Sequence, residues 1–162
     1  MDKKYNLAVV GSTGNVGREI LSILEERDFP IDNLYLLASS SSKGQTINFK
    51  DKEIVVEDLS EFDFSKAQIG LFSPGGSVSA KYAPIAATAG CIVIDNTSFF
   101  RMEENVPLII PEVNADVLDN FFANKERSNI IANPNCSTIQ MLMALKPLHD
   151  AAIINRVVVS TY

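Results

Sequence analysis

Basic residues, cysteines and long apolar runs are all scarce in this sequence, and each scarcity excludes a class of protein. The 162 residues carry 14 Lys and Arg against 20 Asp and Glu, so a surface that binds nucleic acid or an anionic membrane through clustered positive charge is not expected. No stretch approaches the roughly 20 apolar residues that span a bilayer. Cys91 and Cys136 lie far apart in a chain without a secretory signal, which predicts reduced thiols in a cytoplasmic protein.

Apolar residues make up 46% of the sequence and charged residues 21%, which is enough for one core, and the length predicts one domain. Short β-branched runs alternate with helical patterns, as is typical of an α/β protein with a doubly wound, mostly parallel sheet. We expect strands at 5–10, 34–37, 69–72, 91–94, 108–110 and 130–132, a hairpin within 46–57, and helices at 15–27, 79–89, 115–122 and 137–148. The β-rich run 154–161 predicts a last strand at the chain end, which suggests a fragment of a longer protein.

A glycine-rich turn, GSTGNVG at residues 11–17, joins the first predicted strand to the first predicted helix. Backbone N–H groups and the helix dipole at such a turn hold a pyrophosphate, and the missing Cβ atoms let it approach. The GxxGxxG spacing departs from the common GxGxxG pattern, and a tight turn that needs glycine only for its geometry is the other interpretation. Its place after a buried strand favours dinucleotide binding by a Rossmann-like NAD(P)-binding domain.

The end of the second predicted strand has the sequence ASSSSKG at residues 38–44. A site that selects NAD usually has an Asp or Glu here to hold the ribose 2′-hydroxyl. Serine hydroxyls and Lys43 can instead accept a 2′-phosphate, which a carboxylate would repel. We therefore expect NADP, against the simpler interpretation that a serine-rich turn is a solvated loop.

Cys136 lies in the stretch NPNCST, between a predicted strand and a predicted helix. A thiolate gains stability at a helix N-terminus from the dipole and the free N–H groups, which predicts a nucleophile. Cys91 lies in an apolar strand and is expected to be an inert, buried thiol. The single histidine, His149, lies roughly 20 Å along the helix from Cys136 at about 1.5 Å per residue, too far to act as its base. No metal-ligand spacing surrounds any of these residues, and we expect no metal.

Two further polar clusters follow predicted strands. The stretch SPGGS at residues 73–77 could bring backbone close to the cofactor, or could be an ordinary Pro-Gly turn. The stretch DNTS at residues 95–98 is followed by Arg101, which can clamp a phosphate with two hydrogen bonds. A lone Arg is more often a surface charge, so that interpretation stays open as well.

Six stretches, taken in order, resemble the aspartate-semialdehyde dehydrogenase family from end to end: AVVGSTGNVG, ASSSSKG, FSPGGSVS, VIDNTSFFRM, PLIIPEVN and IIANPNCSTIQM. The resemblance implies that Cys136 attacks the aldehyde carbon of a small-molecule substrate, L-aspartate 4-semialdehyde, and that hydride passes to NADP. Phosphate would then release the thioester as L-4-aspartyl phosphate. The family runs this reaction in reverse in the cell, toward lysine, threonine and methionine, and the complete enzyme would be a homodimer or homotetramer.

The resemblance also implies binding roles for other residues. The pyrophosphate would be held by Gly11, Thr13, Gly14, Asn15 and Val16, the 2′-phosphate by Ser39 and Ser42, and the nicotinamide would be approached by Gly75 and Gly76. The transferred phosphate would be bound by Asn96 and Arg101, and the substrate positioned by Asn135. Family members often have an arginine where this sequence has Ser41, and Lys43 would substitute for it.

A second departure concerns groups that come later in the family. Its glutamine lies just after a stretch like VSTY at residues 159–162, and its histidine base and substrate-binding arginine follow. The second domain, which carries the dimer interface, is also absent from these residues. We therefore expect residues 1–162 to be a truncated dinucleotide-binding domain that is inactive alone.

Two other functions remain open on the sequence. N-acetyl-γ-glutamyl-phosphate reductase shares the fold and a cysteine thioester, but it would be expected to show a PGCY-like context where this chain has PNCS. A non-catalytic NADP-binding module is the alternative from a different class, and the presence of Cys136 argues against it.

Overall fold

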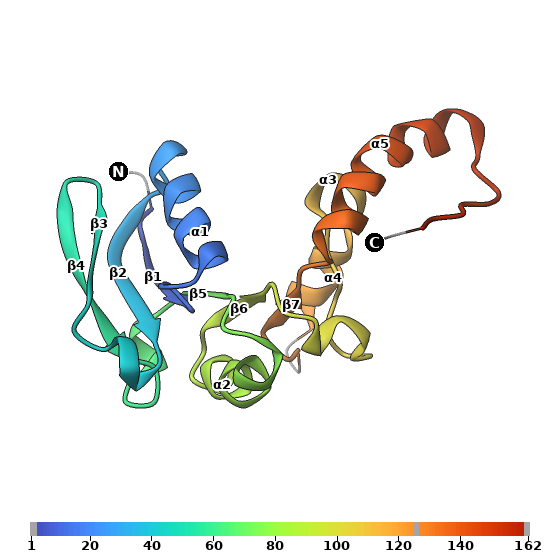
Figure 1. Cartoon of the computed structure of the whole chain (residues 1–162). Coiled ribbons are helices and arrows are strands. Elements are labelled where there is room, and N and C mark those ends of the chain that lie inside the picture. Colours follow the sequence, from blue (N-terminus) through green and yellow to red (C-terminus); the bar gives the residue numbers. More distant parts are fainter. Residues whose placement is uncertain (1–2, 125–126, 161–162) are drawn as a thin grey trace.

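The computed structural model describes residues 3–124 and 127–160, which form one sheet with helices on both of its faces (Figure 1). The strands are β1 (Tyr5–Val10), β2 (Ile31–Ala38), β3 (Thr46–Phe49), β4 (Lys52–Asp58), β5 (Ile69–Phe72), β6 (Ile92–Asp95) and β7 (Ile130–Ala132). They lie in the order β3-β4-β2-β1-β5-β6-β7. β3 and β4 form the predicted antiparallel hairpin, and the other neighbouring strands are parallel.

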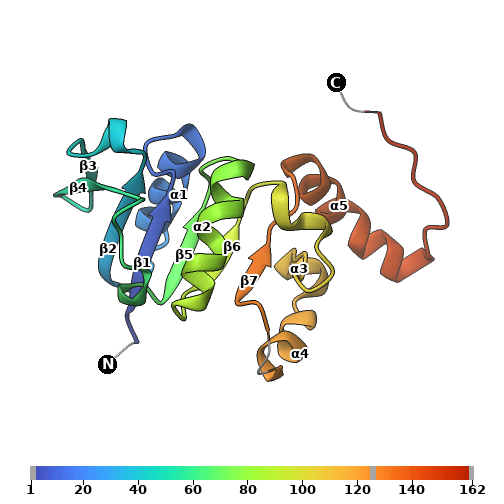
Figure 2. The same cartoon turned by 90° about the horizontal axis from the view of Figure 1, so that it is seen from below.

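Five α-helices and three short 3-10 turns complete the described elements. The helices are α1 (Asn15–Glu26), α2 (Gly76–Thr88), α3 (Pro111–Asn114), α4 (Val117–Ala123) and α5 (Cys136–Ala152), and the 3-10 turns are η1 (Ser40–Ser42), η2 (Phe64–Lys66) and η3 (Phe99–Met102). Figure 2 shows α1 and α2 on opposite faces of the sheet, with α5 extending away beyond β7.

The buried side chains of β1 divide between two cores because successive strand residues point to opposite faces. Leu7 and Val9 pack in the core beneath α1, whereas Ala8 and Val10 pack in the core beneath α2. All four are at most 1% exposed. A central strand that is buried on both faces is what a doubly wound sheet requires, and the predicted fold class is confirmed.

Several helix and strand boundaries differ from those predicted. β2 begins earlier, at Ile31, and α2 begins at Gly76, within the turn predicted to precede it. The helix predicted at 115–122 is found as α4, and the single turn of α3 precedes it in residues for which no helix was predicted. α5 continues through Pro147 to Ala152, because a proline removes one backbone donor without ending a helix that can bend around it.

The strand predicted at 108–110 is wrong. Leu108 forms an isolated bridge to Ala132 of β7, flanked by hydrogen bonds from Ala132 N to Pro107 O at 2.9 Å and from Ile109 N to Ala132 O at 3.0 Å. Pro107 on one side and Pro111 on the other have no N–H to extend the ladder. The pairing therefore stops after one residue, and α3 begins at Pro111.

The strand predicted at 154–161 is wrong over its described part. Residues 154–160 have no regular structure, and Thr161 lies outside the described residues. A β-branched run becomes a strand only where a neighbour supplies backbone partners. Figure 1 shows this segment leaving the end of α5 and running apart from the described strands.

We expect Gly17→Ala to lower the free energy of unfolding by about 2–3 kcal/mol, because a Cβ on Gly17 would lie 2.2 Å from the Gly11 carbonyl oxygen and 2.8 Å from Ser12 Cα. Both contacts are with backbone and cannot relax cheaply. Gly14→Ala is the matched control, since its Cβ would meet the same oxygen at 3.4 Å, and its loss should stay below about 1 kcal/mol. Urea denaturation measures both, and equal losses would contradict this account of the turn.

Candidate functional site

The candidate site lies along one edge of the sheet, where the parallel strands end and ligands collect in open α/β folds. A cavity of about 460 Å³ opens there, over the ends of β1, β2, β4 and β5. It is lined by Gly11, Thr13, Gly14, Ala38, Ser39, Ser40, Asp58, Leu59, Ser60, Ser73, Pro74, Val78 and Tyr82. The glycine-rich turn, predicted to bind the pyrophosphate, and the start of the serine-rich turn at 38–44, predicted to bind the 2′-phosphate, therefore line one cavity.

The turn between β1 and α1 is fixed by the carbonyl oxygen of Leu37 at the end of β2. This oxygen accepts hydrogen bonds from Gly11 N at 2.8 Å, from Ser12 N at 3.2 Å and from Ser12 Oγ at 3.3 Å. Gly11 has φ +83°, and a Cβ there would lie 2.8 Å from the carbonyl oxygen of Ser73. Glycine is thus required both by its backbone angle and by the approach of the next turn.

The turn between β5 and α2 supplies the opposite wall of the cavity. Ser73 N donates to Val10 O at 2.9 Å, which holds this turn beside the glycine-rich turn. Gly75 has φ +95° and is the N-cap of α2, with Gly76 as the first helical residue. Among the described residues other than Gly75 and its two neighbours in the chain, no atom lies within 4 Å of the position that a Cβ of Gly75 would take. The backbone here is open to a ligand.

The part of the cavity lined by residues 38–40 and 58–60 is called the ribose corner, because the ribose 2′ position is expected there. It contains an acidic residue that was not predicted as a site residue. Asp58, at the end of β4, pairs with Ala38 at the end of β2 and lies one strand away from the position where the acid was sought. Its Oδ1 accepts hydrogen bonds from Ser60 Oγ at 2.7 Å and Ser60 N at 2.8 Å, and these bonds hold the pKa of the carboxyl below its usual value. The sequence could have indicated Asp58, because a polar residue at the carboxyl end of a strand that pairs in parallel with β2 can reach the same site.

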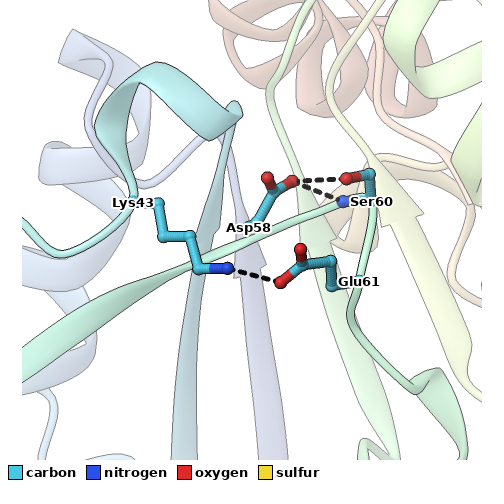
Figure 3. Close-up of polar contacts among 4 residues, drawn as sticks. All are labelled: Lys43, Asp58, Ser60 and Glu61. Atoms are coloured by element: carbon cyan, nitrogen blue, oxygen red, sulfur yellow. Dashed lines mark hydrogen bonds and ion pairs between the residues drawn. The ribbon is translucent and has the colours of Figure 1, made fainter.

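The proposed 2′-phosphate residues differ in their positions. Ser39 lines the cavity, whereas Ser42 and Lys43, at the end of η1, lie outside its lining. Lys43 Nζ forms an ion pair with Glu61 Oε2 at 2.5 Å, and Figure 3 shows the two side chains pointing toward each other. That bond, with the charge of Glu61, raises the pKa of Lys43. Lys43, which was predicted to bind the 2′-phosphate, is therefore already paired with a carboxylate.

A second polar cluster lies at the ends of β6 and β7. Arg101 Nε donates to the Asn133 carbonyl at 2.9 Å and its Nη2 donates to the Asn96 carbonyl at 3.0 Å. Asn133 Nδ2 donates to Asn96 Oδ1 at 2.7 Å. Arg101 is thus held in place by backbone, while its fork has further donors for an anion. Asn133 was not singled out in the sequence, although it directly follows β7.

Cys136 is the first residue of α5, directly after the N-cap Asn135. The Asn135 Oδ1 accepts a hydrogen bond from Thr138 N at 2.8 Å, which is the usual N-cap interaction. Cys136 is exposed, and it lies at the start of the helix, where the first N–H groups have no carbonyl partner within the helix. The predicted position of Cys136 at a helix N-terminus is found, and Asn135 has a direct structural role beside it.

Two of the predicted pyrophosphate residues lie elsewhere. Asn15 and Val16 begin α1 but do not line the cavity. Val16 lines a separate apolar groove between α1 and the sheet, which also contains Asn96 and Asn133.

Within residues 3–124 and 127–160 there is no group of three or more His, Cys, Asp or Glu side chains that could hold a metal, and no helix has the length and apolar content for a membrane crossing.

Comparison with known proteins agrees with the fold. The model of the family described as semialdehyde dehydrogenase, NAD binding domain, matches residues 6–121. A protein of Shewanella sp. strain DB6705 named aspartate-semialdehyde dehydrogenase is 55% identical over 162 residues, which are 100% of this chain and 47% of that protein. The chain thus spans about half the length of the curated relatives it matches.

Solved structures give the same likeness. The structure of aspartate semialdehyde dehydrogenase II from Vibrio cholerae complexed with ASA has a TM-score of 0.87 and 54% identity, and the match covers 92% of this chain and 47% of that one. The structure of aspartate semialdehyde dehydrogenase with NADP from Candida albicans has a TM-score of 0.78 and 25% identity, over 94% of this chain and 48% of that one.

We expect brief alkylation near neutral pH to label Cys136 and leave Cys91 unmodified, with rates that differ by about 100-fold or more. Cys91 is 0% exposed, and burial raises its pKa to about 12, so little thiolate forms and little reagent reaches it. Mass spectrometry after proteolysis locates the label. In urea both cysteines should react, Cys136→Ser should abolish labelling of the native chain, and preferential native labelling of Cys91 would reverse the two assignments.

Proposed function

Since the chain belongs to the semialdehyde dehydrogenase family, we propose that it is the NADP-binding part of an aspartate-semialdehyde dehydrogenase and carries that enzyme's nucleophile, Cys136. One observation carries the proposal: the cavity at the glycine-rich turn and the exposed Cys136 lie along the same edge of one sheet. β1 and β7 are three strand spacings apart in that sheet, about 14 Å, which an extended dinucleotide can bridge. Relatives with this name support the choice of substrate.

The residues around the cavity fit a dinucleotide. At Gly11 a Cβ would collide with the neighbouring turn, and at Gly75 the space where a side chain would stand is open. Thr13 and Gly14, which directly precede α1, line the cavity, so the N–H groups at the start of α1 lie next to it and would hold a pyrophosphate. Bound at this edge, NADP supplies the acceptor for the hydride that leaves the substrate carbon.

The chain's own residues would then carry the remaining steps. Cys136 Sγ attacks the aldehyde carbon of L-aspartate 4-semialdehyde, and after hydride loss that carbon is held as a thioester. Inorganic phosphate attacks the thioester carbon, L-4-aspartyl phosphate leaves, and the thiolate of Cys136 is regenerated. Arg101 and Asn96 would hold the phosphate, since the guanidinium is fixed by two carbonyls and keeps donors for an anion. In biosynthesis the same steps run in reverse.

The preference for NADP is part of the proposal. Ser39 and Ser40 line the ribose corner, and hydroxyl groups accept a 2′-phosphate without charge repulsion. Ser42 and Lys43 lie next to them at the end of η1 and would complete the phosphate site.

We expect Ser39→Asp to weaken NADP binding at least about tenfold and to change NAD binding much less. The new carboxylate would stand in the cavity lining, where it repels a 2′-phosphate but can accept a hydrogen bond from a 2′-hydroxyl. Calorimetry with each dinucleotide measures the effect, and Ser39→Asn is the uncharged control. Equal weakening of both cofactors would show that the ribose 2′ position does not lie at Ser39.

We also expect the 162-residue chain to form NADPH from aspartate semialdehyde and phosphate far more slowly than about one turnover per second, an ordinary enzymatic rate. A general base contributes a factor of about 10²–10⁴, and His149 lies at the far end of α5 from Cys136. Its Nδ1 accepts a hydrogen bond from Ile154 N at 3.2 Å there. Absorbance at the NADPH band follows the reaction, and ordinary turnover by a pure sample would refute this expectation.

A further inference from the structure

The ribose corner contains more negative charge than a 2′-phosphate site needs. Lys43 is the cation of the proposed phosphate site, and it faces two carboxylates, Glu61 and Asp58. Figure 3 shows Lys43 reaching toward Glu61, with Asp58 directed toward Ser60 beside them. A 2′-phosphate that enters this corner meets a lysine whose charge is already balanced.

The ion pair between Lys43 and Glu61 is exposed enough to open. The two side chains are 52% and 66% exposed, so water solvates both when they separate, and such pairs contribute little to stability. Glu61 remains near Lys43 even after the pair opens, because Glu61 N donates to Asp58 O at 3.1 Å and this bond holds its backbone at the end of β4. Repulsion from the Glu61 carboxylate would therefore still weaken the binding of a phosphate by Lys43.

Asp58 is placed differently from Glu61. It is 7% exposed, its Oδ1 is engaged by Ser60, and Leu59 N donates to Ala38 O at 2.8 Å, which fastens the end of β4 to the end of β2. Asp58 is therefore a fixed part of the cavity lining. A ribose 2′-hydroxyl can donate a hydrogen bond to a carboxylate at this place, whereas a 2′-phosphate cannot.

We infer that Glu61 competes with the 2′-phosphate of NADP for Lys43 and so determines how strongly the chain prefers NADP over NAD. The inference rests on the proposed dinucleotide site and assigns its specificity to a residue outside the glycine-rich and serine-rich turns. With Glu61 present, the preference for NADP is small, because the phosphate must displace one anion and remain near it. NAD has a hydroxyl at this position, so its affinity does not depend on the ion pair between Lys43 and Glu61.

The experiment is calorimetric titration of NADP and of NAD into the unaltered chain and four variants at low ionic strength, where exposed charges are least screened. Glu61→Gln should tighten NADP about 3- to 10-fold and change NAD less than about twofold. Glu57→Gln is the matched control, because it removes the same charge from an exposed residue of β4 whose side chain lies on the opposite face from Asp58. It should change neither cofactor by more than about twofold.

The third variant, Glu61→Gln combined with Lys43→Met, tests whether Glu61 acts through the lysine. Compared with Lys43→Met alone, the added Glu61→Gln should change NADP affinity by less than about twofold. Unchanged NADP affinity in Glu61→Gln, or an equal gain for NADP and NAD, would overturn the inference and leave the proposed function standing. If the unaltered chain bound neither dinucleotide, the proposed function would fail and the inference with it.

Discussion

The Leu37 carbonyl oxygen organises this molecule, because the position of the glycine-rich turn depends on it. It accepts hydrogen bonds from two successive amides and from the Ser12 hydroxyl, and Ser12 is completely buried in consequence. The turn is thereby held between the end of β2 and the turn that follows β5. A residue with a Cβ fits neither the angle at Gly11 nor the contact with Ser73. The cavity over the ends of β1, β2, β4 and β5 depends on this turn being held so close to its neighbours.

An acidic protein that binds an anionic ligand needs a positive potential at the binding site itself. With a net charge of -6, this chain cannot attract a dinucleotide by its overall field. The positive potential comes instead from helix N-termini and from single cations held in place. Arg101 is fixed by two carbonyl oxygens, and Lys43 by one carboxylate. Carbonyl groups leave the charge of Arg101 intact, whereas the partner of Lys43 cancels it.

Much of the fold was predictable because strand burial and glycine positions are local signals. β1, β5, β7 and the hairpin of β3 and β4 lie where the pattern of apolar residues placed them. A helix N-terminus beside Cys136 was foreseen from a strand followed by a helical pattern, although the helix was expected to begin at 137. What could not be predicted depends on contacts across the sheet. Asp58 enters the cavity only because β4 pairs with β2, and Glu61 reaches Lys43 only because that pairing brings the two loops together. Residues 154–160 have strand-forming side chains and, among the described strands, no neighbour to pair with.

The short contact between residues 107–109 and β7 has a consequence for association between molecules. β7 is the last strand of the sheet, and an open last strand is a template for pairing with another chain. Here the N–H and the C=O of Ala132 on that side are already bonded to Pro107 and Ile109. Both flanking prolines lack the donor that further growth would need. A segment too short to count as a strand thus occupies the outward N–H and C=O of Ala132, and the chain's own loop blocks another chain from pairing with that residue.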